Sequence, residues 1–214
     1  MSVIEEMICK CTVLMLFFSL LLAPPTSNAE SVSKPLFRML SAVDSGREPY
    51  AKLMQTIYEE LGFKVSIIPT PTKRGIMLLN DEVVDADVMR LKRTVAKYDN
   101  VILVEPPLAK GYLLLLCHKG VPCDLNILQN KTVPIQTHAG ILNLFVPGEL
   151  NAQIIISEMA SNTINMMEAT RIFYALYTVD ELILETVTSK FDHIKIKDVS
   201  GYHVINRKYA HLFT

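Results

Sequence analysis

The first half of the chain alternates short apolar runs with segments of helical spacing. The clearest helix follows Pro49, because its apolar residues recur on one helical face: Tyr50, Leu53, Met54, Ile57 and Leu61. Gly62 comes next and predicts the end of this helix. A short helix is predicted at 73–80, and strands are predicted at 37–43, 64–69, 83–89 and 101–104. Strands and helices in this alternating order are typical of an α/β fold with a parallel sheet.

From residue 112 onward, predicted strands and helices again alternate. Residues 112–118 (YLLLLCH) form a continuous apolar run, as expected of a strand that is buried on both faces. A short helix is predicted at 124–128, and strands are predicted at 131–136, 152–157, 193–197 and 202–207. A longer helix is predicted at 163–177, because four residues share one helical face: Met166, Ala169, Phe173 and Leu176. The chain therefore reads as two α/β units in tandem.

The N-terminus carries a targeting pattern. Residues 11–23 (CTVLMLFFSLLLA) are an unbroken apolar run, and small residues follow, with Ser27 and Ala29 placed for cleavage before Glu30. This pattern predicts a cleaved secretory signal peptide over residues 1–29. The run is shorter than the ~20 apolar residues that span a bilayer. An uncleaved anchor is the alternative, because Glu5 and Glu6 outnumber Lys10 in a region that is normally positive.

Composition excludes several classes of function. The chain has 21 Lys and Arg residues against 22 Asp and Glu residues, a net charge of −1. Nucleic-acid binding through a broad basic surface is therefore not expected. The sequence contains no Cys-x-x-Cys or His-Glu-x-x-His spacing, and its five histidines are scattered. We therefore predict no metal site and no cofactor.

Two cysteines remain once the signal peptide is removed. Cys117 and Cys123 flank a short segment in which Gly120 and Pro122 favour a turn. In an oxidising compartment this pair predicts a disulfide, worth about 2 kcal/mol on the loop-entropy estimate. Two buried free thiols are the alternative.

The order of several short motifs resembles a known family. The stretch PYAKLMQTIYEELGFKVSIIPTPTKRGIMLLNDEVVDADVMR is similar to the first lobe of bacterial periplasmic solute-binding proteins, extracellular family 3. In that family a helix ending in Leu-Gly leads to a strand, and a Val-Asp pair opens a later strand. Leu61-Gly62 and Val84-Asp85 hold these places, and YTVDELILE holds the place of a second Val-Asp strand. The resemblance covers about residues 45–212.

This resemblance implies a type II periplasmic-binding-protein fold, in which two lobes are joined by a hinge and close on a small ligand like a Venus flytrap. We assign residues 30–111 and 194–214 to lobe 1, and residues 112–193 to lobe 2. The family implies a monomer that binds a small-molecule solute without covalent chemistry or a cofactor. Its partners would be the membrane permease of an ABC transporter, or a sensor kinase.

The resemblance also implies ligand-binding residues. The family has a carboxylate-binding Arg in a T-x-x-R pattern, whereas here Thr94 is followed by Lys97. The acidic residue that receives a ligand's amino group corresponds to Glu185, five positions after the second Val-Asp pair. The other candidates supply an aromatic wall, two cations and the first hydroxyl of an anion-binding turn: Tyr50, Arg74, Arg90 and Thr137.

For five of these candidates, a role without ligand contact is the alternative. Arg90 and Lys97 could be surface charges, Glu185 an exposed residue, and Tyr50 and Thr137 core and turn residues. The leading hypothesis is capture of a small polar solute, anionic or amino-acid-like, for uptake or sensing. The alternative is an enzyme on the same scaffold, a dehydratase or a transglycosylase-associated lobe, with Glu185 as the general acid or base.

Overall fold

The computed structural model describes residues 34–42, 47–157 and 160–213. The predicted signal peptide and its cleavage site lie outside these residues. Within the described ranges, no helix is both long enough and apolar enough to cross a membrane.

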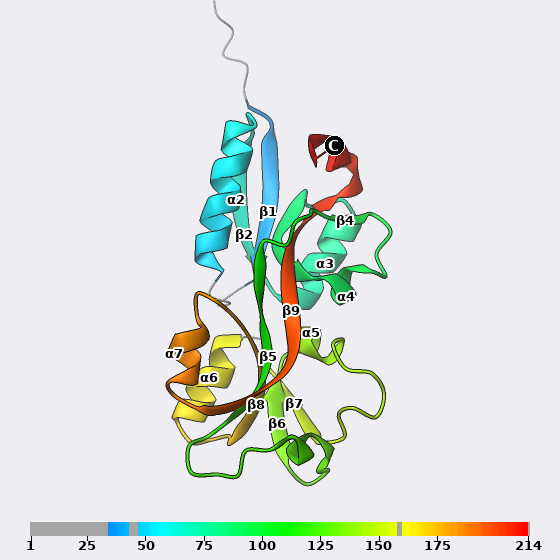
Figure 1. Ribbon diagram of the computed structural model, residues 1–214. Helices are drawn as coiled ribbons and strands as arrows, with labels where there is room; N and C mark the ends of the chain where they lie inside the picture. The colour runs from blue at the N-terminus through cyan, green and yellow to red at the C-terminus, as the bar shows by residue number, and fades with distance from the viewer. Residues whose placement is uncertain (1–33, 43–46, 158–159, 214) are drawn as a thin grey trace, which may run out of the picture. The chain divides into compact units, whose positions relative to one another are not determined.

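The first lobe contains a parallel sheet with helices packed on it (Figure 1). β1 (Leu36–Ala42) pairs in parallel with β2 (Lys64–Thr70) and with β3 (Ala86–Leu91). α2 (Glu48–Glu60) connects β1 to β2, and α3 (Thr72–Asn80) connects β2 to β3. α4 (Lys92–Val95) and β4 (Val101–Leu103) follow. This arrangement confirms the α/β order predicted from the apolar pattern.

The second lobe has a smaller parallel sheet. β6 (Pro134–Thr137) pairs in parallel with β7 (Gln153–Ile156) and with β8 (Tyr174–Asp180). A 3₁₀ turn, η2 (Leu125–Gln129), precedes β6. Short helices occupy the other connections: α5 (Ala139–Leu142), α6 (Ala160–Glu168) and α7 (Leu184–Thr188).

Two long antiparallel strands connect the lobes. β5 (Ala109–Cys117) pairs with β9 (Asp192–Asn206), and β9 also pairs with β3 and β4. The strand order is β2-β1-β3-β9-β5-β8-β6-β7, with β4 beside β9, so both lobes share one sheet. Figure 1 shows β5 and β9 side by side between the two sets of helices. The predicted lobe boundaries fall inside these two strands. A terminal 3₁₀ segment, η3 (Arg207–Phe213), follows β9.

Each lobe has its own hydrophobic core. In the first lobe, Phe37, Met39 and Tyr58 are fully buried between α2 and the sheet. In the second lobe, alternate leucines of β5 enter two different clusters. Leu113 and Leu115 pack in one cluster, and Leu114 and Leu116 pack in the other. The continuous apolar run of this strand is therefore explained by burial of both of its faces.

The predicted helix at 163–177 is wrong in its second half. α6 ends at Glu168, Thr170 has a positive φ of 56°, and the following residues form β8. Ala175, Leu176 and Tyr177 are buried between β5 and β6, which a short apolar run permits as readily as a helix. The two predicted C-terminal strands are also one strand, β9, because the residues between them keep their pairing with β5.

The structure confirms the predicted disulfide. Cys117, the last residue of β5, is bonded to Cys123 across the turn that contains Gly120. Gly120 has a φ of +89°, a conformation that residues with a side chain rarely adopt. The bridge therefore closes the connection from the hinge strand into the second lobe.

Candidate functional site

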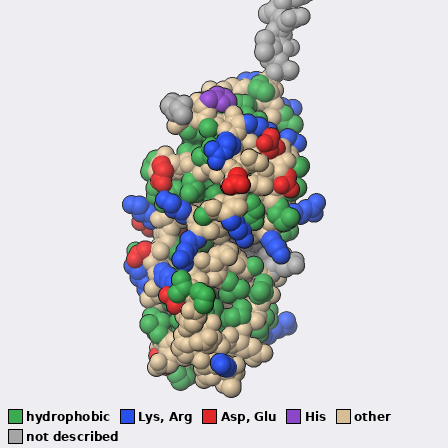
Figure 2. Space-filling model, turned by 90° about the vertical axis from the view of Figure 1, so that its right-hand side faces the viewer, with side chains coloured by type: hydrophobic (Ala, Val, Ile, Leu, Met, Phe, Trp, Pro, Cys, Tyr) green, Lys and Arg blue, Asp and Glu red, His purple; other side chains and the backbone are tan. Residues whose placement is uncertain are grey.

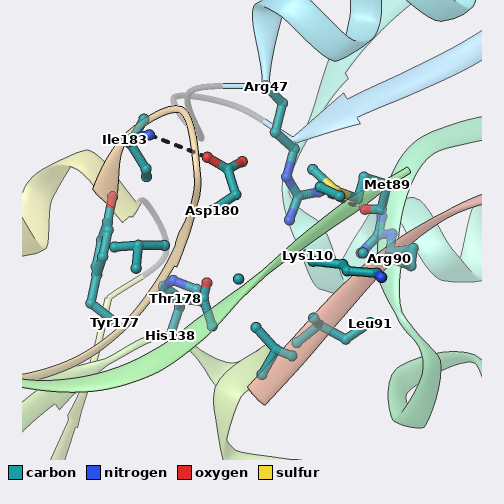
Figure 3. Close-up of a pocket in the computed structure, with 15 residues that line it drawn as sticks. Arg47, Met89, Arg90, Leu91, Lys110, His138, Tyr177, Thr178, Asp180 and Ile183 are labelled. Atoms are coloured by element: carbon teal, nitrogen blue, oxygen red, sulfur yellow. Dashed lines mark hydrogen bonds between the residues drawn. The ribbon is translucent and has the colours of Figure 1, made fainter. Parts of the chain in front are cut away.

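A cavity lies between the lobes, next to the hinge strands. We call it the inner pocket; its volume is about 80 Å³. Residues of β3, β5, β8 and β9 line it, and Figure 3 shows side chains from both lobes pointing into it. Its charged or titratable side chains are Arg47, Arg90, Lys110, His138, Tyr177 and Asp180. The pocket lies at the ends of strands, where open α/β sheets bind their ligands.

A second, larger cavity adjoins the inner pocket. This outer pocket has a volume of about 490 Å³ and lies between α3 and α4 of the first lobe and α5 of the second. Arg90 and His138 line both pockets, so the two cavities are neighbours. The other polar side chains of the outer pocket are Thr72, Lys73, Thr94, Lys97, Tyr98, Asn143 and Ser157. Together the two pockets form a polar cleft between the lobes.

Arg47 enters the inner pocket from the residue that precedes α2. One of its guanidinium nitrogens, Nη1, donates a hydrogen bond of 2.7 Å to the carbonyl of Met89. Burial lowers the pKa of Arg47, and the negative charge of Asp87 opposes this shift. An arginine stays protonated under such a shift, so its remaining N–H groups form a positive wall of the pocket.

Asp180 enters the same pocket from the carboxyl end of β8. Its Oδ1 accepts hydrogen bonds from the backbone N–H groups of Leu182 (3.0 Å) and Ile183 (3.3 Å). In Figure 3 its carboxylate lies across the pocket from Arg47. Burial raises the pKa of Tyr50 to about 12, and the charge of Asp180 and a side-chain hydrogen bond to it add to this shift. Tyr50 and Asp180 therefore connect α2 of the first lobe to β8 of the second.

Arg90 lines both pockets, but its guanidinium is held by its own lobe. Nε donates to Oδ2 of Asp87 at 2.7 Å, and Nη2 contacts the same oxygen. Nη1 donates to the carbonyl of Thr72 at 2.6 Å. A Cβ atom on Gly75 would lie 2.6 Å from Nη2, so glycine leaves room for the guanidinium. These contacts hold the Arg90 guanidinium within its own lobe, and its role as a ligand contact stays a prediction.

The remaining predicted residues are divided between the cleft and the exterior. Tyr50 forms a side-chain hydrogen bond with Asp180, which lines the inner pocket. Lys97 is exposed and lines the outer pocket. Thr137 is fully buried, and its hydroxyl donates a hydrogen bond to the carbonyl of Leu176 at 3.1 Å. The next residue, His138, lines both pockets. Arg74 and Glu185 are exposed and line neither pocket.

Four pocket residues were not among the predicted ligand contacts: Arg47, Lys110, His138 and Asp180. Asp180 had a usable signal, because it is the acidic residue of the second Val-Asp pair, but the ligand-binding acid was assigned five positions later, to Glu185. Burial and the neighbouring charge of Arg47 lower the pKa of His138 to about 4. His138 is therefore neutral at pH 7 and adds no charge to the cleft.

Other side-chain hydrogen bonds among the described residues also join the lobes. Arg93 of α4 donates from Nη1 to the carbonyl of Leu144, just after α5, at 3.1 Å. Lys197 of β9 donates to the same carbonyl at 2.8 Å. In the described part of the chain, no group of three or more His, Cys, Asp and Glu residues is placed to hold a metal ion.

Several solved structures are similar in fold to this chain. An ancestral amino-acid-binding protein, a precursor of cyclohexadienyl dehydratase, is 14% identical; the match covers 83% of this chain and 85% of that protein, with a TM-score of 0.68. A truncated, arginine-bound ArgBP from T. maritima is 12% identical, covers 83% and 91%, and has a TM-score of 0.64. A histidine kinase sensor domain similar to periplasmic binding proteins is 14% identical, covers 84% and 86%, and also has a TM-score of 0.64.

No protein-family model matches the sequence, and no curated protein sequence matches it. At 12–14% identity the structural likeness shows the fold alone. The chain therefore has the mixed α/β, two-lobed fold of type II periplasmic binding proteins.

Proposed function

We propose that this protein binds a small polar solute, anionic or amino-acid-like, in the cleft between its lobes. The observation that carries this proposal is the cleft itself, where polar side chains from both lobes converge on two adjoining cavities. A ligand that contacts both lobes stabilises the closed arrangement, because it binds that arrangement better than an open one. No bond is made or broken in this account.

The wider setting follows from the sequence pattern and the fold. The apolar N-terminal run supports export to the periplasm, and the disulfide is consistent with an oxidising compartment. A permease of an ABC transporter and a sensor kinase are the two kinds of partner. The neighbours of this fold include a substrate-binding protein of an amino acid ABC transporter and a sensor domain.

The enzyme alternative depends on Glu185 as the general acid or base, and this residue lies outside the cleft. Glu185 lies in the first turn of α7, is exposed, and lines neither pocket. A general acid or base must reach the reacting atoms, within hydrogen-bond distance or through one water. Binding is therefore the function that the cleft supports best.

A thermal-shift screen tests the proposal. Purified protein is heated with amino acids, dicarboxylates and short peptides, since a solute at 100 times its Kd adds about 2.7 kcal/mol to the free energy of unfolding. At least one solute should raise Tm. Asp180→Asn should abolish or weaken that shift, while Glu185→Gln, a matched carboxylate outside the pockets, should leave it intact. Folded protein that no solute stabilises would contradict the proposal, as would equal effects of the two variants.

A further inference from the structure

One loop of the second lobe is contacted by cations from outside that lobe. It joins α5 to β7 over residues 143–152, and we call it the α5–β7 loop. Figure 2 shows Lys and Arg side chains gathered in a band across the face that carries α3, α4 and α5. Arg93 of α4 and Lys197 of β9 both donate to the Leu144 carbonyl of this loop, at 3.1 and 2.8 Å. Neither cation lines the inner or the outer pocket, so the contact is separate from the candidate binding site.

A bulge in β9 directs Lys197 to the loop. Lys195 pairs with Leu114 and Lys197 pairs with Leu113, so Ile196 is an extra residue between them. Leu113 and Leu114 belong to the hydrophobic clusters on the two opposite faces of β5. Because paired residues of antiparallel strands share a face, the bulge puts the two lysines on opposite faces of the sheet. Only Lys197 is thereby placed on the face that carries the α5–β7 loop.

The loop holds the acceptor in a fixed position. The side chain of Leu144 is 9% exposed and packs in the core of the second lobe. Glu149 Oε2 accepts hydrogen bonds from Nζ of Lys197 at 2.7 Å and from the backbone N–H of Val146 at 2.9 Å. These two bonds lower the pKa of Glu149, and the charges of Lys197 and Arg93 add to the shift. An ionised Glu149 therefore ties the loop to the hinge strand at pH 7.

Arg93 contacts the loop from the first lobe. It lies in α4, which is anchored by Val95, a residue that is 4% exposed in the core of the first lobe. The Arg93 guanidinium therefore moves with the first lobe, whereas the Leu144 carbonyl moves with the second. A hinge motion that opens the cleft would separate these two groups.

We propose that Arg93 and the α5–β7 loop form a latch that favours the closed arrangement of the lobes without contacting the solute. A hydrogen bond from a guanidinium to a carbonyl is charge-assisted, and this one forms in only one of the two arrangements. It therefore shifts the equilibrium between them. If the cleft binds a solute as proposed above, the latch would strengthen binding of every solute alike. The latch itself acts in the solute-free protein and is tested there.

Double electron–electron resonance on solute-free protein tests the latch. Spin labels on Thr56→Cys in α2 and Thr186→Cys in α7 report the separation of the lobes; both positions are exposed and line neither pocket. Arg93→Ala should lower the ratio of closed to open molecules at least about threefold, since one hydrogen bond from a charged group is lost. Lys92→Ala is the matched control, because Lys92 also lies in α4 but its ion pair, at 3.9 Å, is with Glu105 of the first lobe.

A second variant tests the loop side of the latch. Glu149→Gln removes the charge that pairs with Lys197, so it should also lower the closed fraction, by less than Arg93→Ala. Because Arg93 and Glu149 act on the same loop, the double variant should change the ratio by less than the product of the two separate effects. Circular dichroism confirms that each variant is folded.

The outcomes distinguish the latch from the proposed function. If Arg93→Ala gives the wild-type distances, or if Lys92→Ala opens the lobes as much, the latch is wrong and solute binding stands. Wild-type protein that shows only the open distance, or fully independent effects of Arg93→Ala and Glu149→Gln, would also overturn the latch. Failure of solute binding appears separately, in the thermal-shift screen.

Discussion

Replacing Arg90 tests whether its buried ion pair with Asp87 stabilises the fold. Its side chain is 4% exposed and that of Asp87 is 0% exposed, so Arg90→Ala leaves a buried carboxylate without its cation. Removing one partner of a buried ion pair typically costs about 3–5 kcal/mol. In a chain of this size 1 kcal/mol moves Tm by roughly 2–4 °C, so we expect a decrease of roughly 6–20 °C.

Arg38 provides a matched control. It also pairs with a buried aspartate, Asp85, but its own side chain is 42% exposed and the distance is 3.6 Å. Asp85 keeps other partners when Arg38 is removed, Lys208 at 3.0 Å and Tyr209 at 3.1 Å. Arg38→Ala should therefore cost about 1 kcal/mol or less.

The assay is urea unfolding at pH 7, followed by circular dichroism. Arg90→Lys should give an intermediate loss, because it keeps the charge but not the fork that contacts Asp87 and the Thr72 carbonyl at once. If Arg90→Ala and Arg38→Ala unfold with free energies within 1 kcal/mol of each other, the buried pair does not stabilise the fold as described.

Three further predictions concern a buried histidine, the disulfide and two glycines. Burial lowers the pKa of His203 from 6.5 to about 4, so the unfolded chain takes up its proton first. This residue should therefore lower the free energy of unfolding by about 2 kcal/mol between pH 7 and pH 5, in addition to the loss from His138, whose pKa is also lowered to about 4. Urea titrations should show a smaller loss for His203→Gln, and an equal loss would contradict the cause. Reducing the bridge between Cys117 and Cys123, which are six positions apart, should lower the free energy of unfolding by about 2 kcal/mol, and an unchanged Tm with both thiols labelled would be contrary evidence. A Cβ at Gly111 would lie 1.9 Å from the Val179 carbonyl oxygen, whereas at Gly140 the nearest atom lies at 3.9 Å. Gly111→Ala should therefore cost about 1–3 kcal/mol or more in urea unfolding, with Gly140→Ala near wild type; equal stability of the two would refute this reasoning.

Much of the fold could be predicted because burial leaves a clear pattern in the sequence. α2 was predicted from its apolar spacing, and Gly62, with a φ of +91°, follows directly after Leu61. The buried side is shifted from the predicted face: Ala51, Met54 and Tyr58 are buried, whereas Leu53 and Leu61 are exposed. The leucines of β5 are continuous because both faces of that strand are buried. β8 was missed because residues 173–179 are a short apolar run that fits a helix or a strand. Only the pairing with β5 and β6 decides between them.

The candidate site was less predictable, because it depends on where side chains point after folding. Arg90 and Thr137 were both predicted to contact a ligand. In the structure the Arg90 guanidinium donates a hydrogen bond to Asp87, and the Thr137 hydroxyl donates one to the Leu176 carbonyl. Counting from the second Val-Asp pair led to Glu185, whereas Asp180 itself reaches the inner pocket. Arg47 lies in no recognisable motif, and its place directly before α2 brings it into the pocket.

The most direct test of the account is a crystal structure of the protein grown with a saturating solute found by the screen. The account predicts density for that solute between the lobes, bounded by Arg47, His138 and Asp180. A third cavity of about 650 Å³ lies within the first lobe, lined by residues of β1, α2 and β2. Solute density in that cavity, with the cleft between the lobes left to water, would contradict the central claim.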